Sequence, residues 1–159
     1  KVARRNAPAL LGGIGIVSRS ASLTSEVVAQ VTAENLGQST TIGVGGDPIH
    51  GISMVECVEL FLADPETQGI VLIGEIGGTE EQEVAEFLQG RKVTKPIVAL
   101  IAGQHAPPER RMGHAGTLTM YGRGDANSKI AALEKAGVRV APSSHLVGAT
   151  IRQALLLPH

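Results

Sequence analysis

Residues 69–74 form an unbroken apolar run between two glycines, Gly-Ile-Val-Leu-Ile-Gly, and residues 75–78 follow it as Glu-Ile-Gly-Gly. A short run of branched apolar residues bounded by glycine is typical of a strand that is buried on both faces. Strands of this kind belong to parallel sheets, whose faces are covered by helices. Residues 69–74 therefore predict one strand of such a sheet, with a single carboxylate, Glu75, directly after it.

Other stretches of the chain repeat this pattern on both sides of residues 69–74. Apolar runs that predict further buried strands are Gly13–Ser18, Thr40–Gly45, Pro96–Ala102 and Val138–Ala141. Helical periodicity predicts helices at Leu23–Asn35, Ile52–Ala63, Thr79–Gln89, Asn127–Ala136 and Leu146–Leu156. Helix C-termini favour a following glycine, and three of these helices have one: Gly37, Gly90 and Gly137. This alternation predicts a doubly wound α/β domain over residues 13–157, with a five-stranded, flavodoxin-like parallel sheet and helices on both faces.

The composition limits the classes of protein to which the chain can belong. Its 159 residues fit one domain with a real core, and a net charge of −1 offers no general attraction for nucleic acid or anionic membranes. No apolar run approaches the ~18 residues of a membrane span. The one cysteine, Cys57, excludes an internal disulfide and is expected in the core, because its helix is apolar around it. With 20 glycines, two phenylalanines and one tyrosine, the chain suits a site built from backbone amides.

Residues 1–12 differ from the rest of the chain. Lys1, Arg4 and Arg5 make a basic start, and the first acidic residue is Glu26. We interpret residues 1–12 as a linker from a missing upstream domain. The remnant of a transit peptide would have a similar composition and is the alternative.

Polar segments follow the first four predicted strands. They are Ser18–Ser20, Gly45–Asp47, Glu75–Gly78 and the long stretch Gly103–Gly124. In doubly wound folds, ligands bind beyond the carboxyl ends of the strands. The four segments are therefore expected to meet at one edge of the sheet and to form a site there.

A histidine stands out in the last of these segments, within Arg111-Met112-Gly113-His114-Ala115-Gly116. Small neighbours leave the imidazole bare, which suits a base, a ligand or a nucleophile. A loop of about twenty residues inside a compact domain is usually functional or disordered. A surface or capping histidine is the alternative. Glu75 could hold the far nitrogen of such an imidazole, or could cap a neighbouring helix.

Three further groups of residues suit an anion or substrate site, and each has a simpler interpretation. Ser18, Ser20 and Ala21 lead into the first helix, where serines act as N-caps and where free amides also attract anions. Gly45 and Gly46 make either a tight turn or a backbone contact to a ligand. Arg111 is either a solvated charge or a phosphate contact, three residues from His114.

Six motifs, in this order, make the chain resemble a known family. They are GIVSRSAS (15–22), GVGGDPIHG (43–51), DPETQGIVLIGEIGG (64–78), TKPIVALIAG (94–103), APPERRMGHAG (106–116) and KIAALEKAGVRV (129–140). Over roughly residues 13 to 155, the sequence is similar to the second, ligase domain of the alpha subunit of succinyl-CoA synthetase. The relatives of that family, malate-CoA ligase, citryl-CoA synthetase and ATP-citrate lyase, share the pattern.

The resemblance implies roles for particular residues. His114 corresponds to the histidine that is phosphorylated during turnover, and Glu75 to the glutamate that hydrogen-bonds it. It implies a phosphate site at Ser18, Ser20, Ala21, Gly113 and Arg111, and a substrate site at Ser25, Gly45 and Gly46. Two positions depart from the family pattern: Ala21 stands where glycine is usual, and Ser25 where succinyl-CoA synthetases have tyrosine.

The resemblance also implies a reaction and partners. A nucleoside triphosphate phosphorylates His114, a substrate carboxylate takes the phosphoryl group, and the CoA thiol displaces phosphate. Succinate is the first expectation for the acid, with malate or citrate as alternatives. CoA and Mg-ATP or Mg-GTP are expected on an upstream CoA-binding Rossmann domain and an ATP-grasp beta subunit or domain. This domain alone is then inactive, holds no metal, and works in the cytoplasm, with the mitochondrial matrix as the alternative.

Functions from other classes stay open at this point. A non-catalytic flavodoxin-like binding or assembly module is one alternative, but a flavin site would need more aromatic residues. A phospho-acceptor receiver domain would need an aspartate after its central strand, where this chain has Glu75. A degenerate assembly subunit is the third, and the intact GHAG and GEIGG motifs argue against it.

Overall fold

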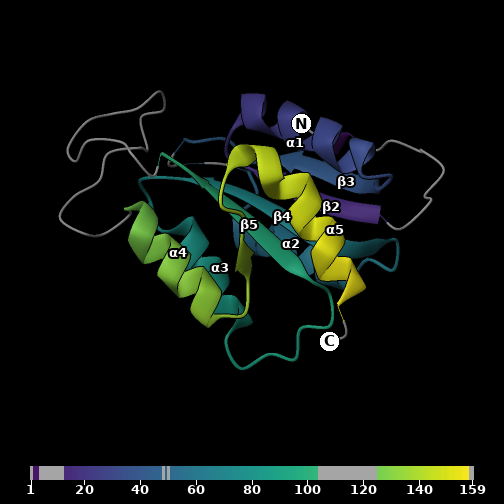
Figure 1. Cartoon of the computed structure of the whole chain (residues 1–159). Coiled ribbons are helices and arrows are strands. Elements are labelled where there is room, and N and C mark those ends of the chain that lie inside the picture. The colour runs from purple at the N-terminus through teal and green to yellow at the C-terminus, as the bar shows by residue number, and fades with distance from the viewer. Residues whose placement is uncertain (1, 4–12, 48, 50, 104–124, 158–159) are drawn as a thin grey trace.

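The computed structural model describes residues 2–3, 13–47, 49, 51–103 and 125–157, which build a six-stranded sheet in the order β1-β3-β2-β4-β5-β6 (Figure 1). The strands are β1 (Val2–Ala3), β2 (Gly13–Ser18), β3 (Gly37–Gly43), β4 (Thr67–Glu75), β5 (Ile97–Ala102) and β6 (Arg139–Val140). The helices are α1 (Ala21–Ala33), α2 (Met54–Ala63), α3 (Glu80–Leu88), α4 (Ala126–Lys135) and α5 (Val147–Leu156), with the 3-10 turn η2 (Ser144–Leu146) before α5.

The predicted fold class is confirmed. Strands β2 to β6 run parallel in the order β3-β2-β4-β5-β6. This is the flavodoxin-like order, in which the first parallel strand lies between the second and the third. The sheet has one strand more than predicted, because Val2 and Ala3 of β1 pair antiparallel with Ile42 and Thr41 of β3. Two residues are too short a run to carry a strand pattern in the sequence.

The interpretation of residues 1–12 as a linker stays a prediction. Val2 and Ala3 form an edge strand, whereas Lys1 and residues 4–12 lie outside the described residues.

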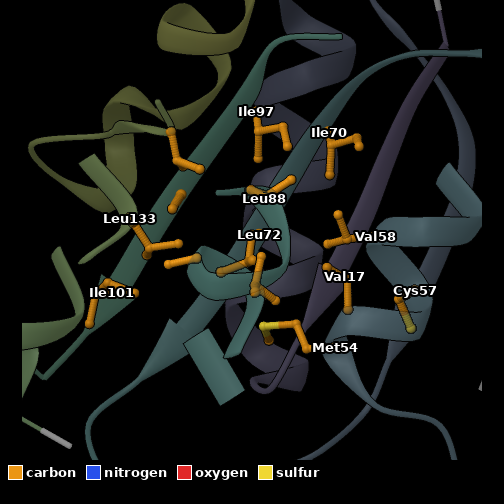
Figure 2. Close-up of a cluster of buried hydrophobic side chains, with 14 of the residues drawn as sticks. Val17, Met54, Cys57, Val58, Ile70, Leu72, Leu88, Ile97, Ile101 and Leu133 are labelled. Carbon is orange, nitrogen blue, oxygen red and sulfur yellow. The ribbon is translucent and has the colours of Figure 1, made fainter. Parts of the chain in front are cut away.

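Helices cover both faces of the sheet because successive strand side chains point to opposite sides. In β4, Ile70 and Leu72 join the core cluster against α2, α3 and α4, whereas Val71 and Ile73 join the cluster against α1 and α5. Figure 1 shows the same division, with α1 and α5 on one face and α3 and α4 side by side on the other. Figure 2 shows the core cluster against α2, α3 and α4. Cys57 belongs to it and is 0% exposed, which confirms the prediction that this cysteine lies in the core.

Burial of the strands follows their position in the sheet. The inner strands β2, β4 and β5 are almost wholly buried, as predicted. The same prediction was wrong for β3 and β6, which are partly exposed. Strand β6 is an edge strand, and β3 is covered only by the short β1 on its outer side.

Two of the three glycines predicted to follow helices take the left-handed conformation, and the third prediction was wrong. Gly90 and Gly137 take positive φ angles of 74° and 85° after α3 and α4, as predicted. After α1 the left-handed residue is Asn35, with φ 58°, and not the predicted Gly37. Asparagine is one of the few residues that tolerate this conformation, and Gly37 instead begins β3, where it pairs with Gly13.

Side-chain caps begin three of the helices. Ser20 caps α1, Asp125 caps α4, and Ser53 forms a reciprocal capping box with Glu56 at α2. Helix α1 therefore begins at Ala21, two residues before the predicted Leu23. Among the helices of the described residues, none is long and apolar enough to cross a membrane.

Candidate active site

The carboxyl ends of the inner strands meet at one edge of the sheet. Ser18 ends β2, Glu75 ends β4, and Ala102 ends β5. In the register of the sheet, Ser18 lies beside Ile73 and Glu75 beside Ala102. The backbone N–H of Val44, after β3, donates to the Ser18 carbonyl at 2.8 Å. Four segments that the sequence singled out therefore leave the sheet from the same side.

Glu75 is held at this edge by an arginine that follows the neighbouring strand. Arg19 Nη2 lies 3.3 Å from Glu75 Oε1, and the two side chains are 3% and 9% exposed. Glu75 makes further interactions besides this pair. The carboxylate that the sequence analysis placed after a buried strand is thus itself nearly buried and faces a cation.

Two more buried charged side chains join this pair, and we call Arg19, Glu75, Glu81 and Lys129 the buried ion cluster. Glu80 of α3 lies at its margin, with Oε1 3.9 Å from Arg19 Nε. Glu81 of α3 and Lys129 of α4 are both fully buried and form an ion pair. Arg19 Nη1 donates to Glu81 Oε1 at 2.9 Å. Charged residues are almost never buried this deeply unless they are paired, and here each cation contacts a carboxylate.

The buried ion cluster also binds the backbone of the turn after β4. Lys129 Nζ donates to the carbonyls of Glu75 and Gly77 at 2.8 and 2.6 Å. Arg19 Nη1 donates to the same Gly77 carbonyl at 2.9 Å. The Glu75 N–H donates to Glu81 Oε1 at 3.0 Å. Residues 75–77 are therefore fixed through both their backbone and the Glu75 side chain.

Glycines make this turn possible. Gly77 and Gly78 have φ angles of 83° and 64°, in the region that residues with a Cβ rarely adopt. Gly74 leaves room for the cluster, since a Cβ there would lie 2.6 Å from Glu81 Cγ. The three glycines of the Gly-Glu-Ile-Gly-Gly motif thus have a structural reason of their own, apart from any chemistry of Glu75.

Burial and pairing act in opposite directions on the ammonium of Lys129. Loss of hydration lowers the pKa of Lys129 from its ordinary 10.5, while the charge of Glu81 and its hydrogen bond oppose that shift. Among the neighbours of Lys129, Glu81 therefore favours its charged form most strongly.

The start of α1 lies next to this cluster in the chain, directly after Arg19. Ser18 Oγ donates to the Ser20 carbonyl at 2.8 Å, and Ser20 Oγ accepts from the Leu23 N–H at 3.4 Å. The N-cap interpretation of Ser20 is therefore confirmed. Ala21 is exposed in the first turn, which has no acidic residue. The positive end of the helix dipole is thus left without a neutralising carboxylate in that turn; a phosphate-binding role for these residues stays a prediction.

The residues predicted to bind substrate are not members of the buried ion cluster. Gly45 takes a φ of 84° after β3, in open space, and Gly46 is half-buried. Ser25 is exposed on α1 and, with Thr24 and Val28 among others, lines a groove of about 570 Å³ between α1 and β3. Among the described site residues, the structure thus joins Glu75 and the segment that follows Ser18, but not Ser25.

Three predicted site residues, His114, Gly113 and Arg111, lie outside the described residues. One described residue near each end of residues 104–124 nevertheless contacts the turn after β4. On one side, the Ala102 carbonyl accepts from the Ile76 N–H at 3.2 Å. On the other side, α4 begins at Ala126, and its Lys129 binds the carbonyls of Glu75 and Gly77.

Sequence reasoning missed the structural roles of Arg19, Glu81 and Lys129. A signal for two of them was present. Lys129 is spaced with Ala126 and Leu133 on the buried face of α4, and Glu81 shares the buried face of α3 with Val84. A charged residue at a core-facing position of a helix indicates that its charge is paired in the folded protein. The spacing alone does not identify the partner.

Comparison with known proteins identifies the family of this site. The sequence profile of the family described as CoA-ligase matches residues 17–144, which span every segment of the candidate site. The chain belongs to the CoA-ligase family.

Members of the CoA-ligase family are similar to the chain over most of its length. The alpha subunit of the ADP-forming succinate–CoA ligase of Aquifex aeolicus is 52% identical over 144 residues, covering 91% of this chain and 47% of that protein. The same subunit from Staphylococcus aureus is 46% identical over 143 residues, covering 90% and 47%. The chain therefore spans about half the length of the curated relatives it matches.

Solved structures agree with this family membership. The structure of ATP citrate lyase from Methanosaeta concilii in complex with (3S)-citryl-CoA matches with a TM-score of 0.84 and 28% sequence identity. The match covers 91% of this chain and 24% of that one. The fold described above is thus one part of a larger protein in that relative.

Proposed function

We propose that the chain is the phosphohistidine domain of a nucleoside-diphosphate-forming acid–CoA ligase. The observation that carries this proposal is the turn after β4. Its Glu75 carboxylate is fixed at the carboxyl edge of the sheet by Arg19. Ala102 and Lys129, which lie near the two ends of segment 104–124, are hydrogen-bonded to the same turn. We propose that His114, which belongs to this segment, lies beside the Glu75 carboxylate.

In the proposed first step, a ring nitrogen of His114 attacks the γ-phosphorus of ATP or GTP. A nitrogen–phosphorus bond forms and the bond to the diphosphate breaks. Glu75 accepts a hydrogen bond from the other ring nitrogen, which fixes the tautomer and stabilises the positive charge of the imidazole. Covalent transfer through a histidine divides one difficult condensation into easier steps.

In the second step, a carboxylate oxygen of the substrate acid attacks the phosphorus, and His114 leaves as the neutral imidazole. In the third step, the thiol of CoA, after loss of its proton, attacks the acyl carbon and displaces inorganic phosphate, giving the thioester. Transfer of this kind depends on positioning and charge stabilisation. We assign that role to the start of α1 at Ser18, Ser20 and Ala21, together with Gly113 and Arg111.

Two partner modules complete the proposed enzyme. The relatives are named as alpha subunits, and this chain covers 47% of the Aquifex aeolicus subunit. We assign the nucleotide with its magnesium to an ATP-grasp beta subunit or domain, and CoA to an upstream Rossmann domain. The domain alone is then expected to carry the phosphoryl group without completing the reaction.

Succinate is the acid that we propose, and citrate or malate are the alternatives. Identities of 52% and 46% to proteins named succinate–CoA ligase support succinate. The likeness to an ATP citrate lyase at 28% identity favours citrate as the second candidate. Ser25, in place of the tyrosine of succinyl-CoA synthetases, frees volume for a larger acid, and we assign Ser25, Gly45 and Gly46 to the substrate site.

Steady-state assays of the assembled enzyme test this proposal. We expect ATP or GTP, CoA and succinate to give a thioester with release of the nucleoside diphosphate and phosphate. If citrate or malate exceeds succinate in kcat/KM by more than about tenfold, or ~1.4 kcal/mol, the succinate assignment is wrong. If none of the three acids yields a thioester, the proposed function itself fails, and a binding or assembly role replaces it.

A further inference from the structure

Burying the charged side chains of the buried ion cluster in a small domain costs hydration free energy. Arg19 is 3% exposed, and Glu81 and Lys129 are 0% exposed. Burying ion pairs costs hydration that their attraction often only balances, so well-packed apolar residues of similar size would stabilise the fold equally well or better. Stability alone therefore does not account for four charged residues, from three elements and the loop after β2, meeting at one turn.

The bonds of the cluster converge on a single part of the chain. Arg19 and Lys129 bind the carbonyls of Glu75 and Gly77, and Glu81 accepts from the Glu75 N–H. Within the cluster, the contact with the Glu75 carboxylate comes from Arg19. Arg19 is thus the link between the Glu81–Lys129 pair and the carboxylate at the edge of the sheet.

The planar guanidinium suits this link. Its Nη1 contacts Glu81 and the Gly77 carbonyl at 2.9 Å each, while its Nη2 lies 3.3 Å from Glu75 Oε1. Arginine offers several donors in a fixed geometry, whereas lysine offers one compact charge on a flexible stem. A lysine here could reach either the Glu81 side or the Glu75 side, but could not hold both in the same geometry.

We propose that Arg19 positions the Glu75 carboxylate for its contact with His114, and that the Glu81–Lys129 pair holds Arg19 and the turn after β4 in register. Arg19 is then a positioning residue that acts through Glu75. Lys129 adds a second link, because it ties the start of α4, next to segment 104–124, to the same turn. This inference rests on the proposed function, in which Glu75 acts on His114.

A double-mutant cycle tests the inference in the assembled enzyme. The variants are Arg19→Lys, Glu75→Gln and the two combined, and the readout is the single-turnover rate of His114 phosphorylation at saturating ATP. We expect Arg19→Lys alone to slow this rate at least about tenfold, with the KM for ATP unchanged. In the Glu75→Gln background, the same change should slow it by less than about twofold, because the residue through which it acts is already lost.

A surface arginine provides the matched control. Arg152 pairs with Glu34 at 3.0 Å on the exterior, so Arg152→Lys makes the same chemical change away from the turn after β4 and should leave the rate unchanged. If Arg19→Lys does not assemble, the combined variant Glu81→Gln/Lys129→Met takes its place. It removes both charges of the pair together, so that neither is left buried without its partner, and it should be equally non-additive with Glu75→Gln.

The remaining outcomes separate this inference from the proposed function. Two results would overturn the positioning role and leave the phosphohistidine proposal intact. The first is a double variant in which the two rate reductions multiply, and the second is a phosphorylation rate of Arg19→Lys equal to that of wild type. An unchanged rate in Glu75→Gln alone would remove the role of Glu75 in the proposed function, and with it this inference.

Discussion

At the scale of single residues, Glu75 takes part in the site through both its backbone and its charged side chain. Its N–H and carbonyl belong to the network of the turn after β4, and its carboxylate pairs with Arg19 at 3.3 Å. Replacing it by glutamine keeps a hydrogen-bonding group of the same shape and removes the negative charge. The substitution therefore separates the chemical role of Glu75 from its structural one.

We expect Glu75→Gln to slow phosphorylation of His114 by at least about tenfold, because the amide cannot offset the charge of the imidazolium. Rapid-quench measurement of phosphorylated enzyme provides the rate, and binding to the partner subunit should be unchanged. Glu86→Gln, on the exposed side of α3, is the matched control. Wild-type rates of phosphorylation and dephosphorylation in Glu75→Gln would mean that Glu75 is only structural.

Cys57 gives a second prediction at this scale. Burial raises the pKa of its thiol from 9.0 to about 11, with Glu56 adding to the shift. The folded state therefore favours the protonated thiol, and this preference is fully present below pH 9 and is lost as the pH rises through 11. We expect Cys57 to resist a thiol reagent at pH 8 in the native protein and to react at once in denaturant. Rapid native labelling at pH 8 would contradict its place in the core.

Sequence reasoning reached some residues of the site and not others. Glu75 was found because it follows a buried strand directly, and the edge of a parallel sheet gives such a residue a defined place. The roles of Glu81 and Lys129 were not predicted, because each residue lies within a predicted helix whose periodicity alone does not identify a buried charge. Their pairing depends on how α3 and α4 pack against each other, and that information is not local in the sequence.

At the scale of the elements, glycines determine how closely the layers approach. A Cβ on Gly15 of β2 would lie 2.7 Å from the Phe61 ring of α2, whereas a Cβ on Gly43 at the end of β3 would meet nothing within 4 Å. Gly15 therefore sets the distance between β2 and α2, and Gly43 does not constrain any neighbour. The pair allows a matched comparison of the same substitution.

We expect Gly15→Ala to lower the free energy of unfolding by about 1–3 kcal/mol through overpacking. Gly43→Ala should change it by less than about 0.5 kcal/mol. Denaturant titration of both variants measures the difference. Equal effects of the two substitutions would show that β2 and α2 are not in the close contact described.

The elements themselves were largely predictable. The apolar runs of β2, β4 and β5 were recognisable because these strands are buried on both faces, and the α helices were recognisable from their periodicity. The two-residue β1 was not, because it is too short to carry a strand pattern. The partial exposure of β3 and β6 was not, because an apolar run does not reveal which strands lie at or next to an edge of the sheet. The left-handed residue after α1 is Asn35 and not the predicted Gly37, because glycine is the stronger signal for that conformation in a sequence.

At the scale of the whole molecule, the doubly wound topology gathers segments distant in sequence at one edge. Arg19 follows β2, Glu75 ends β4, and Lys129 belongs to α4, yet all three contact one turn. The role of His114 is a proposal from the family pattern, and Ala102 and Lys129, near the two ends of its segment, bond to that turn. The chain spans about half of its Aquifex aeolicus relative, so the complete reaction is a property that we propose for the assembled enzyme.

Transfer of phosphate to His114 is the central claim, and labelling measures it directly. The assembled enzyme is incubated with ATP labelled at the γ-phosphate, and the label on this chain is followed in wild type and in His114→Asn. We predict stoichiometric label that is labile in acid and stable in base, lost from His114→Asn without loss of the fold, and discharged when the acid substrate and CoA are added. Undiminished label on the His114→Asn variant, or label with the acid stability of a phosphoserine, would contradict the claim.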